Sequence, residues 1–257
     1  MARRKRPTGL PAPFLRGLRV EAGTLDGRSG RYPFTLPWLS DAFELEFEQP
    51  VTILAGENGT GKSTLIEGVA ALAGYDEAGG GKGYRPVDHE GAVDENGGPL
   101  AEVLRASWLP RVTDGWFFRA ETFFDVARYL DAVGSSSADF LSYSHGEGFL
   151  RFFRERLGRQ GLYIFDEPES ALSPRRQVEF LSILADIQES GRAQVIMATH
   201  SPLLMAVPGA TLLRMTHRGL SPVSYRDTDH FRLWQGFAVD PEGFLKTALA
   251  GDLDTLV

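Results

Sequence analysis

Residues 51–64 read VTILAGENGTGKST, and this stretch decides the fold. Residues 51–55 are mostly apolar and favour a buried strand, whereas residues 65–73 favour a helix. Between them lies the pattern G-x-x-x-x-G-K-[ST], within what we call the glycine loop (residues 56–64). Glycines let successive backbone N–H groups point into one concavity, and the N-terminus of the following helix adds a partial positive charge there. The sequence therefore predicts a binding site for the phosphates of a nucleoside triphosphate.

Two side chains of the glycine loop are predicted to act on the phosphates and on the metal ion. Lys62 supplies a full positive charge to the phosphates, and Ser63 offers its hydroxyl to Mg²⁺. The rest of the loop is expected to contact the nucleotide through Glu57, Asn58, Gly59, Thr60, Gly61 and Thr64.

The composition is that of a globular protein. Hydrophobic residues make up 42% of the 257 residues, which is ample for a core. There is no cysteine, and no apolar run approaches the roughly 20 residues that span a bilayer, so we expect a cytoplasmic protein without membrane insertion. The net charge of −7 argues against a general polyanion binder, although the basic residues 3–6 leave a local contact with nucleic acid open.

The hydrophobic pattern indicates one α/β domain over residues 1–257. Residues 1–13 are expected to form a mobile basic tail, and the glycine-rich residues 75–99 a long surface loop. Continuous apolar strands that alternate with helices are typical of a mainly parallel sheet covered on both faces. Strands are expected at 14–21, 43–48, 51–55, 115–120, 161–165, 194–199 and 211–215. Helices are expected at 65–73, 100–106, 121–133, 148–157, 174–190, 228–236 and 241–249.

Two carboxylates follow a second buried strand. Residues 162–165 read LYIF, and Asp166 and Glu167 come directly after them. Ligands of open α/β sheets sit at the carboxyl ends of the strands, so both side chains are expected beside the glycine loop. Asp166 is expected to hold the coordination shell of Mg²⁺. Glu167 is expected to orient or deprotonate a water molecule that attacks the terminal phosphate.

One histidine is expected at the same edge of the sheet. His200 ends the strand at 194–199, which is predicted to lie next to the strand of Asp166. It is therefore expected to sense the γ-phosphate or to orient the water. No cluster of histidines and carboxylates has metal-ligand spacing, so we expect no transition-metal site. The histidines to which this reasoning gives no place in the site are His89, His217 and His230.

In this order the motifs resemble those of the ABC-type ATPase superfamily, nearer its SMC and RecF-like branch than its transporters. The chain is similar to small stand-alone bacterial ATPases that carry an AAA label and are ABC-like. The resemblance implies ATP as the nucleotide and a P-loop NTPase fold like an ABC-ATPase head, with an N-terminal antiparallel β subdomain. The segments that carry it are GENGTGKST (56–64), FFRAETFF (117–124), SYSHGE (142–147), YIFDEPESALSP (163–174) and MATHSP (197–202).

The resemblance also implies a site shared between two subunits. In this superfamily a signature loop at the start of a helix reaches the ATP bound to the opposite subunit, and residues 142–147 match it in position. Ser144, Gly146 and Glu147 are therefore expected to contact ATP in trans, in a homodimer that forms on ATP binding. The segment between the glycine loop and residue 144 is too short for the coiled-coil arms of SMC proteins, and it contains no heptad pattern.

Three positions depart from the family pattern. Glu121 stands where the family has a Q-loop glutamine, and it is expected to act on Mg²⁺ or water. Ser173 replaces the D-loop carboxylate that would cross the dimer interface. His145 replaces the first glycine of the signature loop.

The leading hypothesis is a Mg²⁺-dependent ATPase that dimerises on ATP and acts as a switch or motor for a partner. Its catalytic residues are expected to be Glu167, His200 and Lys62. Two alternatives stay open: a nucleotide-gated binding module with negligible turnover, and the ATPase subunit of a membrane transporter. The sequence does not identify the partner, and DNA or a protein effector of a defence type is compatible with it.

Overall fold

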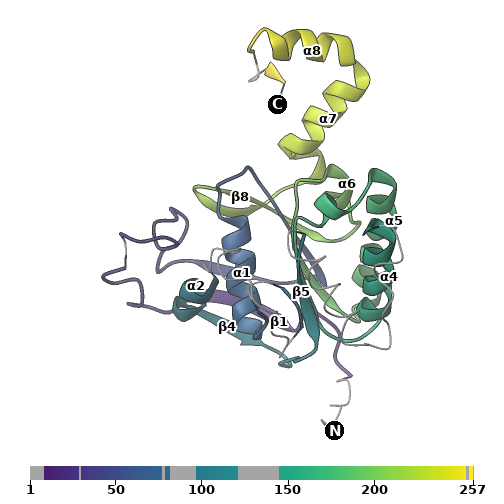
Figure 1. Ribbon diagram of the computed structural model, residues 1–257. Coiled ribbons are helices and arrows are strands. Elements are labelled where there is room, and N and C mark those ends of the chain that lie inside the picture. The colour runs from purple at the N-terminus through teal and green to yellow at the C-terminus, as the bar shows by residue number, and fades with distance from the viewer. Residues whose placement is uncertain are drawn as a thin grey trace.

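The computed structural model describes residues 9–28, 30–76, 79–81, 97–120, 145–252 and 255–256 (Figure 1). In this part of the chain the main sheet has the strand order β5-β6-β7-β3-β8-β9. Successive pairs are parallel as far as β8, and only β9 is antiparallel to its neighbour. The prediction of an α/β fold with a mainly parallel sheet is therefore confirmed. The strands are β3 (Val51–Ala55), β5 (Gly115–Arg119), β6 (Leu162–Asp166), β7 (Gln194–Ala198), β8 (Thr211–Thr216) and β9 (Gly219–Pro222).

Side chains from alternate positions of each strand enter two different cores, one on each face of the main sheet. Phe165 lies in the core beneath α4 and α5, whereas its neighbour Ile164 lies in the core beneath α1 and α2. Figure 1 shows α4 and α5 on one side of the sheet and α1 on the other. The helices are α1 (Lys62–Ala73), α2 (Gly97–Val103), α4 (His145–Leu157), α5 (Pro174–Ser190) and the short α6 (Pro202–Met205).

A second, antiparallel sheet contains β2 (Glu44–Glu46), β1 (Leu15–Val20) and β4 (Leu104–Trp108) in that order. It agrees with the antiparallel N-terminal part that the resemblance implied. The prediction of a helix over residues 100–106 is wrong beyond residue 103, where β4 begins. β4 pairs with β1 from Val20–Leu104 to Leu15–Trp108, and this long-range pairing outweighs the local helical preference.

Two predicted irregular segments are more ordered at their ends than expected. The predicted tail 1–13 is already packed at Ala12, which is buried and donates its backbone N–H to Gly191 O at 2.8 Å. The predicted surface loop 75–99 begins with the buried Tyr75, whose hydroxyl donates to Leu162 O at 2.9 Å. The same loop ends within α2 instead of before it. The helix predicted at 121–133 lies outside the described residues.

The chain ends in two helices that follow β9 and the short 3₁₀ helix Tyr225–Asp227. They are α7 (Asp229–Val239) and α8 (Pro241–Leu249), and we call them the C-terminal arm (residues 229–249). No residue of either helix is buried. Figure 1 shows the arm extending away from the rest of the chain, beyond α6. Among the described residues, no helix has both the length and the apolar character needed to cross a membrane.

One buried side chain ties the antiparallel sheet to the main sheet. Gln194, at the start of β7, is fully buried, and its Oε1 accepts hydrogen bonds from the backbone N–H groups of Phe14 and Leu15 at 2.8 Å each. Its Nε2 donates to Leu15 O at 2.9 Å. These backbone groups have lost water, so they depend on the glutamine for their hydrogen bonds.

We expect Gln194→Leu to lower the free energy of unfolding by about 3 kcal/mol, because it leaves two buried N–H groups and one carbonyl without a partner. Urea denaturation measures this change. Gln160 provides a matched control, because its amide also reaches the N-terminal segment, at Leu10 O, but through an exposed hydrogen bond. Gln160→Leu should change the unfolding free energy by less than about 0.5 kcal/mol. Equal losses in the two variants would contradict a structural role specific to Gln194.

Candidate functional site

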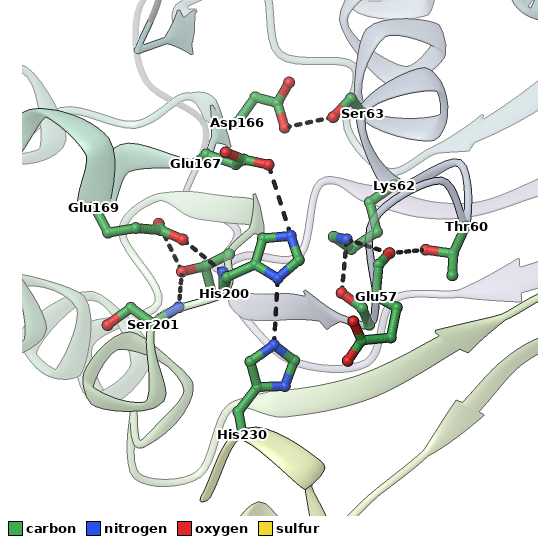
Figure 2. Close-up of polar contacts among 12 residues, drawn as sticks. Glu57, Thr60, Lys62, Ser63, Asp166, Glu167, Glu169, His200, Ser201 and His230 are labelled. Atoms are coloured by element: carbon green, nitrogen blue, oxygen red, sulfur yellow. Dashed lines mark hydrogen bonds and ion pairs between the residues drawn. The ribbon is translucent and has the colours of Figure 1, made fainter. Parts of the chain in front are cut away.

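The carboxyl ends of three neighbouring strands meet at one edge of the main sheet. β7 lies between β6 and β3, and Ala198 is paired with Asp166 on one side and Leu54 on the other. The glycine loop follows β3, Glu167 follows β6 and His200 follows β7. The prediction that the strands of Asp166 and His200 are neighbours is therefore confirmed. Figure 2 shows the side chains of Lys62, Ser63, Asp166, Glu167 and His200 gathered at this edge.

Two glycines of the glycine loop cannot be replaced without strain. Gly56 has φ 154°, and a Cβ atom built on it would lie 2.3 Å from Met215 O. Gly61 has φ 92°, and its Cβ would lie 2.9 Å from Nε1 of Trp38. These backbone conformations are rarely accessible to other residues, so glycine is required for the shape of the loop. Trp38 is buried and donates its Nε1–H to Thr60 O at 2.9 Å, so this aromatic residue supports the loop.

The first turn of α1 faces this loop with uncapped N–H groups. Gly61 is its N-cap and provides no side-chain hydrogen bond, and the first turn contains no acidic residue. A helix N-terminus in this state is a favourable position for an anion. Lys62 reaches back over the loop, where its Nζ donates to Gly56 O at 2.7 Å and Glu57 O at 2.9 Å. Burial lowers the pKa of Lys62, while the neighbouring carboxylates, led by Glu167, oppose this change.

The predicted magnesium ligands lie next to each other. Ser63 Oγ donates to Asp166 Oδ1 at 3.2 Å, across the end of β7. A hydroxyl and a carboxylate are oxygen ligands of the kind that Mg²⁺ uses together with phosphate oxygens and water. Within the described ranges no three His, Asp or Glu side chains converge as a metal site of their own. The donor set therefore fits a Mg²⁺ ion that shares its coordination with a bound nucleotide.

Glu167 is held in an unusual backbone conformation. Its φ is 48°, which makes it the non-glycine residue with positive φ among those described. Such a conformation costs energy and persists where the surroundings enforce it, here including a hydrogen bond from Glu167 N to Ala198 O at 3.0 Å. Glu167 Oε1 lies 3.7 Å from Nε2 of His200. The turn after β6 thus brings the two predicted catalytic side chains together.

His200 presents a nitrogen that lacks a partner. Its Nε2 is buried and makes no hydrogen bond within the described part of the chain, since Glu167 is too distant for one. Burial lowers the pKa of His200, with a further contribution from the positive charge of Lys62. A neutral, buried imidazole nitrogen beside Glu167 that has no hydrogen-bond partner is available to a ligand.

Glu169 belongs to this site although the sequence reasoning gave it no role. It lies in the 3₁₀ helix Pro168–Ala171, and its carboxylate accepts the backbone N–H of His200 at 2.5 Å and the hydroxyl of Thr199 at 2.7 Å. Thr199 in turn accepts the backbone N–H of Ser201 at 3.0 Å. Glu169 therefore fixes the chain around His200. The signal in the sequence was a carboxylate only two residues after Glu167, at the end of a buried strand.

His230 was wrongly left out of the site. It lies at the start of α7, and its Nε2 is 3.3 Å from Nδ1 of His200. It was excluded because, unlike His200, it does not end a strand predicted at this edge, and 30 residues separate the two histidines along the chain. The chain runs from His200 through β8, β9 and the following turn before it places His230 beside His200. No local sequence pattern indicates this contact.

Several predicted site residues cannot be compared with the structure. Glu121 and Ser144 lie outside the described residues, as do the side chains of Gly146 and Glu147. α4 begins at His145, close to the helix start expected for the signature loop. Ser173 is the N-cap of α5, where its Oγ accepts the backbone N–H of Arg176 at 3.4 Å.

Burial raises the pKa of Glu169, with opposition from its hydrogen bonds to Thr199 and His200. The folded protein then holds this proton more tightly than the unfolded chain. This tighter binding of the proton by Glu169 stabilises the folded state below the pKa that the group has in the unfolded chain. The stabilisation is lost as the pH rises through the pKa of the folded state. We therefore expect the unfolding free energy of Glu169→Gln, relative to the parental protein, to increase from pH 4.5 towards neutrality.

The size of this increase is about 1.4 kcal/mol for each unit by which the pKa is raised. Urea denaturation at several pH values measures it. Glu189→Gln, the same chemical change at an exposed position of α5, is the control. A flat profile for Glu169→Gln would contradict the assigned effect of burial.

Two family models match parts of the chain. Residues 35–104 match "AAA domain". Residues 133–206 match "AAA domain, putative AbiEii toxin, Type IV TA system". The molybdate import ATP-binding protein MolC of Haemophilus influenzae is 26% identical over 180 residues, which cover 63% of this chain and 67% of MolC.

Solved structures with a related arrangement include an SMC head domain from Thermotoga maritima. It is 14% identical, with a TM-score of 0.45 and coverage of 82% of this chain and 100% of that one. The cbiO1 protein of Clostridium perfringens, part of the ABC transporter complex cbiONQ, is 16% identical, with a TM-score of 0.39 and coverage of 80% and 90%. The matched family models, the similarity to MolC and the order of the motifs point the same way: the chain is similar to ABC-type ATPases.

Proposed function

We propose that this protein is a Mg²⁺-dependent ATPase whose site is completed by a second copy of the chain. The observation that carries the proposal is the convergence of the glycine loop, the Ser63–Asp166 pair and His200 at one sheet edge. The Nε2 of His200 is buried and makes no hydrogen bond among the described residues, so it would be free to donate to the terminal phosphate of a nucleotide bound there. The similarity to AAA-domain models and to an import ATP-binding protein supports the same reaction.

Different residues of this chain would bind the phosphates and activate the attacking water. Backbone N–H groups of the glycine loop and of the first turn of α1 hold the phosphates. Lys62 must leave the carbonyls of Gly56 and Glu57 to reach them, which a bound phosphate makes favourable by offering charge-assisted hydrogen bonds. Glu167 orients or deprotonates the attacking water, and His200 donates its Nε2–H to the γ-phosphate.

Ser63 and Asp166 would hold Mg²⁺, and Glu121 is the third proposed contributor. When bound, Mg²⁺ offsets charge on the phosphate oxygens. Asp166 is buried, and a divalent cation held there would offset its negative charge.

Dimerisation would supply the groups that one chain lacks. Ser144, Gly146 and Glu147 would contact the nucleotide held by the opposite subunit, at the start of α4. ATP would thus hold two copies together, and hydrolysis would release them, so the protein would act as a cytoplasmic switch for a partner. The family description of residues 133–206 refers to a toxin system, which supports a defence-type effector, and DNA is the other candidate.

We expect Glu167→Gln to bind ATP, to hydrolyse it at least about 100-fold more slowly, and to accumulate as an ATP-bound dimer. The amide keeps the size of the side chain but cannot accept the proton of the water. Phosphate release measures turnover, and light scattering after size-exclusion chromatography measures the dimer.

Asp186→Asn is the control for this variant, because it makes the same chemical change at an exposed position of α5. It should hydrolyse ATP at the parental rate. Parental turnover in Glu167→Gln would show that another group activates the water. Slow turnover without a dimer would contradict the shared site and leave the assignment of Glu167 standing.

A second candidate is the ATPase subunit of a transporter, which the similarity to an import ATP-binding protein favours. The absence of a Q-loop glutamine at Glu121 weighs against it, because that residue couples such subunits to their permeases. Affinity capture of the tagged chain from its own cells separates the two. A co-purifying membrane permease would support the transporter, whereas an ATP-dependent homodimer without a permease would support the switch.

A further inference from the structure

The C-terminal arm reaches the candidate site through one side chain. We propose that His230 is a positioning residue that donates a hydrogen bond to His200 and so fixes which nitrogen of His200 carries its proton. This inference rests on the proposed function, because the nitrogen thus protonated is the one that would meet the γ-phosphate. Figure 2 shows the two imidazole rings in line, with Glu167 on the far side of His200.

The geometry of the two rings suits a direct hydrogen bond. His200 Nδ1 and His230 Nε2 are 3.3 Å apart, and the ring centroids are 5.5 Å apart at an interplanar angle of 47°. Rings in this relation meet edge to edge through their nitrogens and do not stack. The other nitrogen of His200, Nε2, lies 3.7 Å from Glu167 Oε1. His200 is thus held between a histidine and a carboxylate.

The start of α7 is well fixed where it presents His230. The N-cap Thr228 is 2% exposed and accepts the backbone N–H of Phe231 at 3.2 Å. Its hydroxyl also donates to Tyr225 O at 2.8 Å. Phe231 packs edge-on against Tyr225, with ring centroids 4.8 Å apart. These contacts lock the residues on both sides of His230, so the position of its ring is set by the backbone.

Only one arrangement of protons satisfies both neighbours of His200. In a neutral imidazole one nitrogen donates and the other accepts. If His200 donated from Nδ1 to His230, its Nε2 lone pair would face the carboxylate of Glu167, which is unfavourable. If His230 donates from Nε2 instead, His200 carries its proton on Nε2, directed towards Glu167 and a bound phosphate. The hydrogen bond from His230 thus selects the form of His200 that can donate to a phosphate.

Both rings are neutral near physiological pH in this arrangement. Burial lowers the pKa of both histidines, and the charge of Lys62 lowers them further. The carboxylates that oppose this are Glu57 and Glu167 around His200, and Glu57 and Asp229 around His230. A protonated pair would place two like charges 3.3 Å apart, beside Lys62.

The arm beyond His230 is otherwise exposed. The last residues of α7 and the whole of α8 bury no side chain, and α8 packs on α7 through Phe237 and Phe244 at 5.7 Å between centroids. The exposed end of α7 and α8 therefore contribute no side chain to a core, whereas the start of α7 is held by Thr228 and Phe231. His230 is the residue through which the arm contacts the candidate site.

Replacement of His230 by two different residues tests this role. His230→Phe keeps a ring but loses the donor, and we expect kcat for ATP to fall about tenfold with little change in KM. His230→Gln keeps an N–H near the position of Nε2, so its kcat should stay within about threefold of the parental value. Trp234→Ala, one turn further along α7 and exposed, should hydrolyse ATP at the parental rate. An equal loss in His230→Phe and His230→Gln would overturn the proposed role.

A double-mutant cycle shows whether His230 acts through His200. His230→Phe should have no further effect on kcat in a His200→Ala background, because the residue to be positioned is absent. A full additional loss in the double mutant would overturn the inference, since it would mean that His230 acts on another group.

The protonated nitrogen can also be observed without any turnover. Long-range ¹H–¹⁵N spectra of histidine-labelled protein, assigned with single substitutions, distinguish the two neutral forms. We expect His200 in the Nε2–H form in the parental protein and a mixture of both forms in His230→Phe. A parental protein with the proton on Nδ1, or unchanged spectra in His230→Phe, would overturn the inference. Parental protein without ATPase activity would contradict the proposed function alone, because these spectra would still report on the two histidines.

Discussion

The parallel pairing of β6, β7 and β3 is the constraint on which the candidate site depends. It brings the carboxyl ends of three strands that are distant in the sequence to one edge of the sheet. A different kind of group follows each strand at this edge. N–H groups and a lysine follow β3, two carboxylates lie at the end of β6, and a histidine follows β7. A shift of β6 by one residue would turn Asp166 to the other face of the sheet, away from Ser63.

Charge balance explains why a metal ion is part of this account. Lys62 is surrounded by the carboxylates of Glu167, Asp166, Glu57 and Glu169, all of which act on its pKa. Among these groups the carboxylates outnumber the lysine, which opposes the binding of a polyphosphate. The N-terminus of α1 and a divalent ion between Ser63 and Asp166 would supply the missing positive charge. Glu169 lessens the repulsion because burial favours its protonated form.

The sequence predicted the parts of the site that local patterns encode. Each of these parts is encoded by a short contiguous stretch of sequence. They are the glycines at 56 and 61, the apolar strand before Asp166 and the strand before His200, and the structure has all of them where they were predicted. β4 was missed because its pairing with β1 is long-range, although its residues favoured a helix locally. His230 was missed for a related reason: an arm of the chain returns it to His200, and nothing in its neighbourhood signals that return. The positive φ of Glu167 was likewise not predicted, and it accompanies a long-range hydrogen bond from Glu167 N to Ala198 O.

The proposed ATPase requires that the glycine loop and Asp166 bind a Mg²⁺–nucleotide complex. The most direct measurement is a calorimetric titration with a non-hydrolysable ATP analogue in the presence of Mg²⁺ or of a chelator. Binding with a Kd between about 1 µM and 1 mM that requires Mg²⁺, and that is lost in Lys62→Met, agrees with the account. Absence of binding to the folded parental protein, or equal affinity in Lys62→Met, contradicts it.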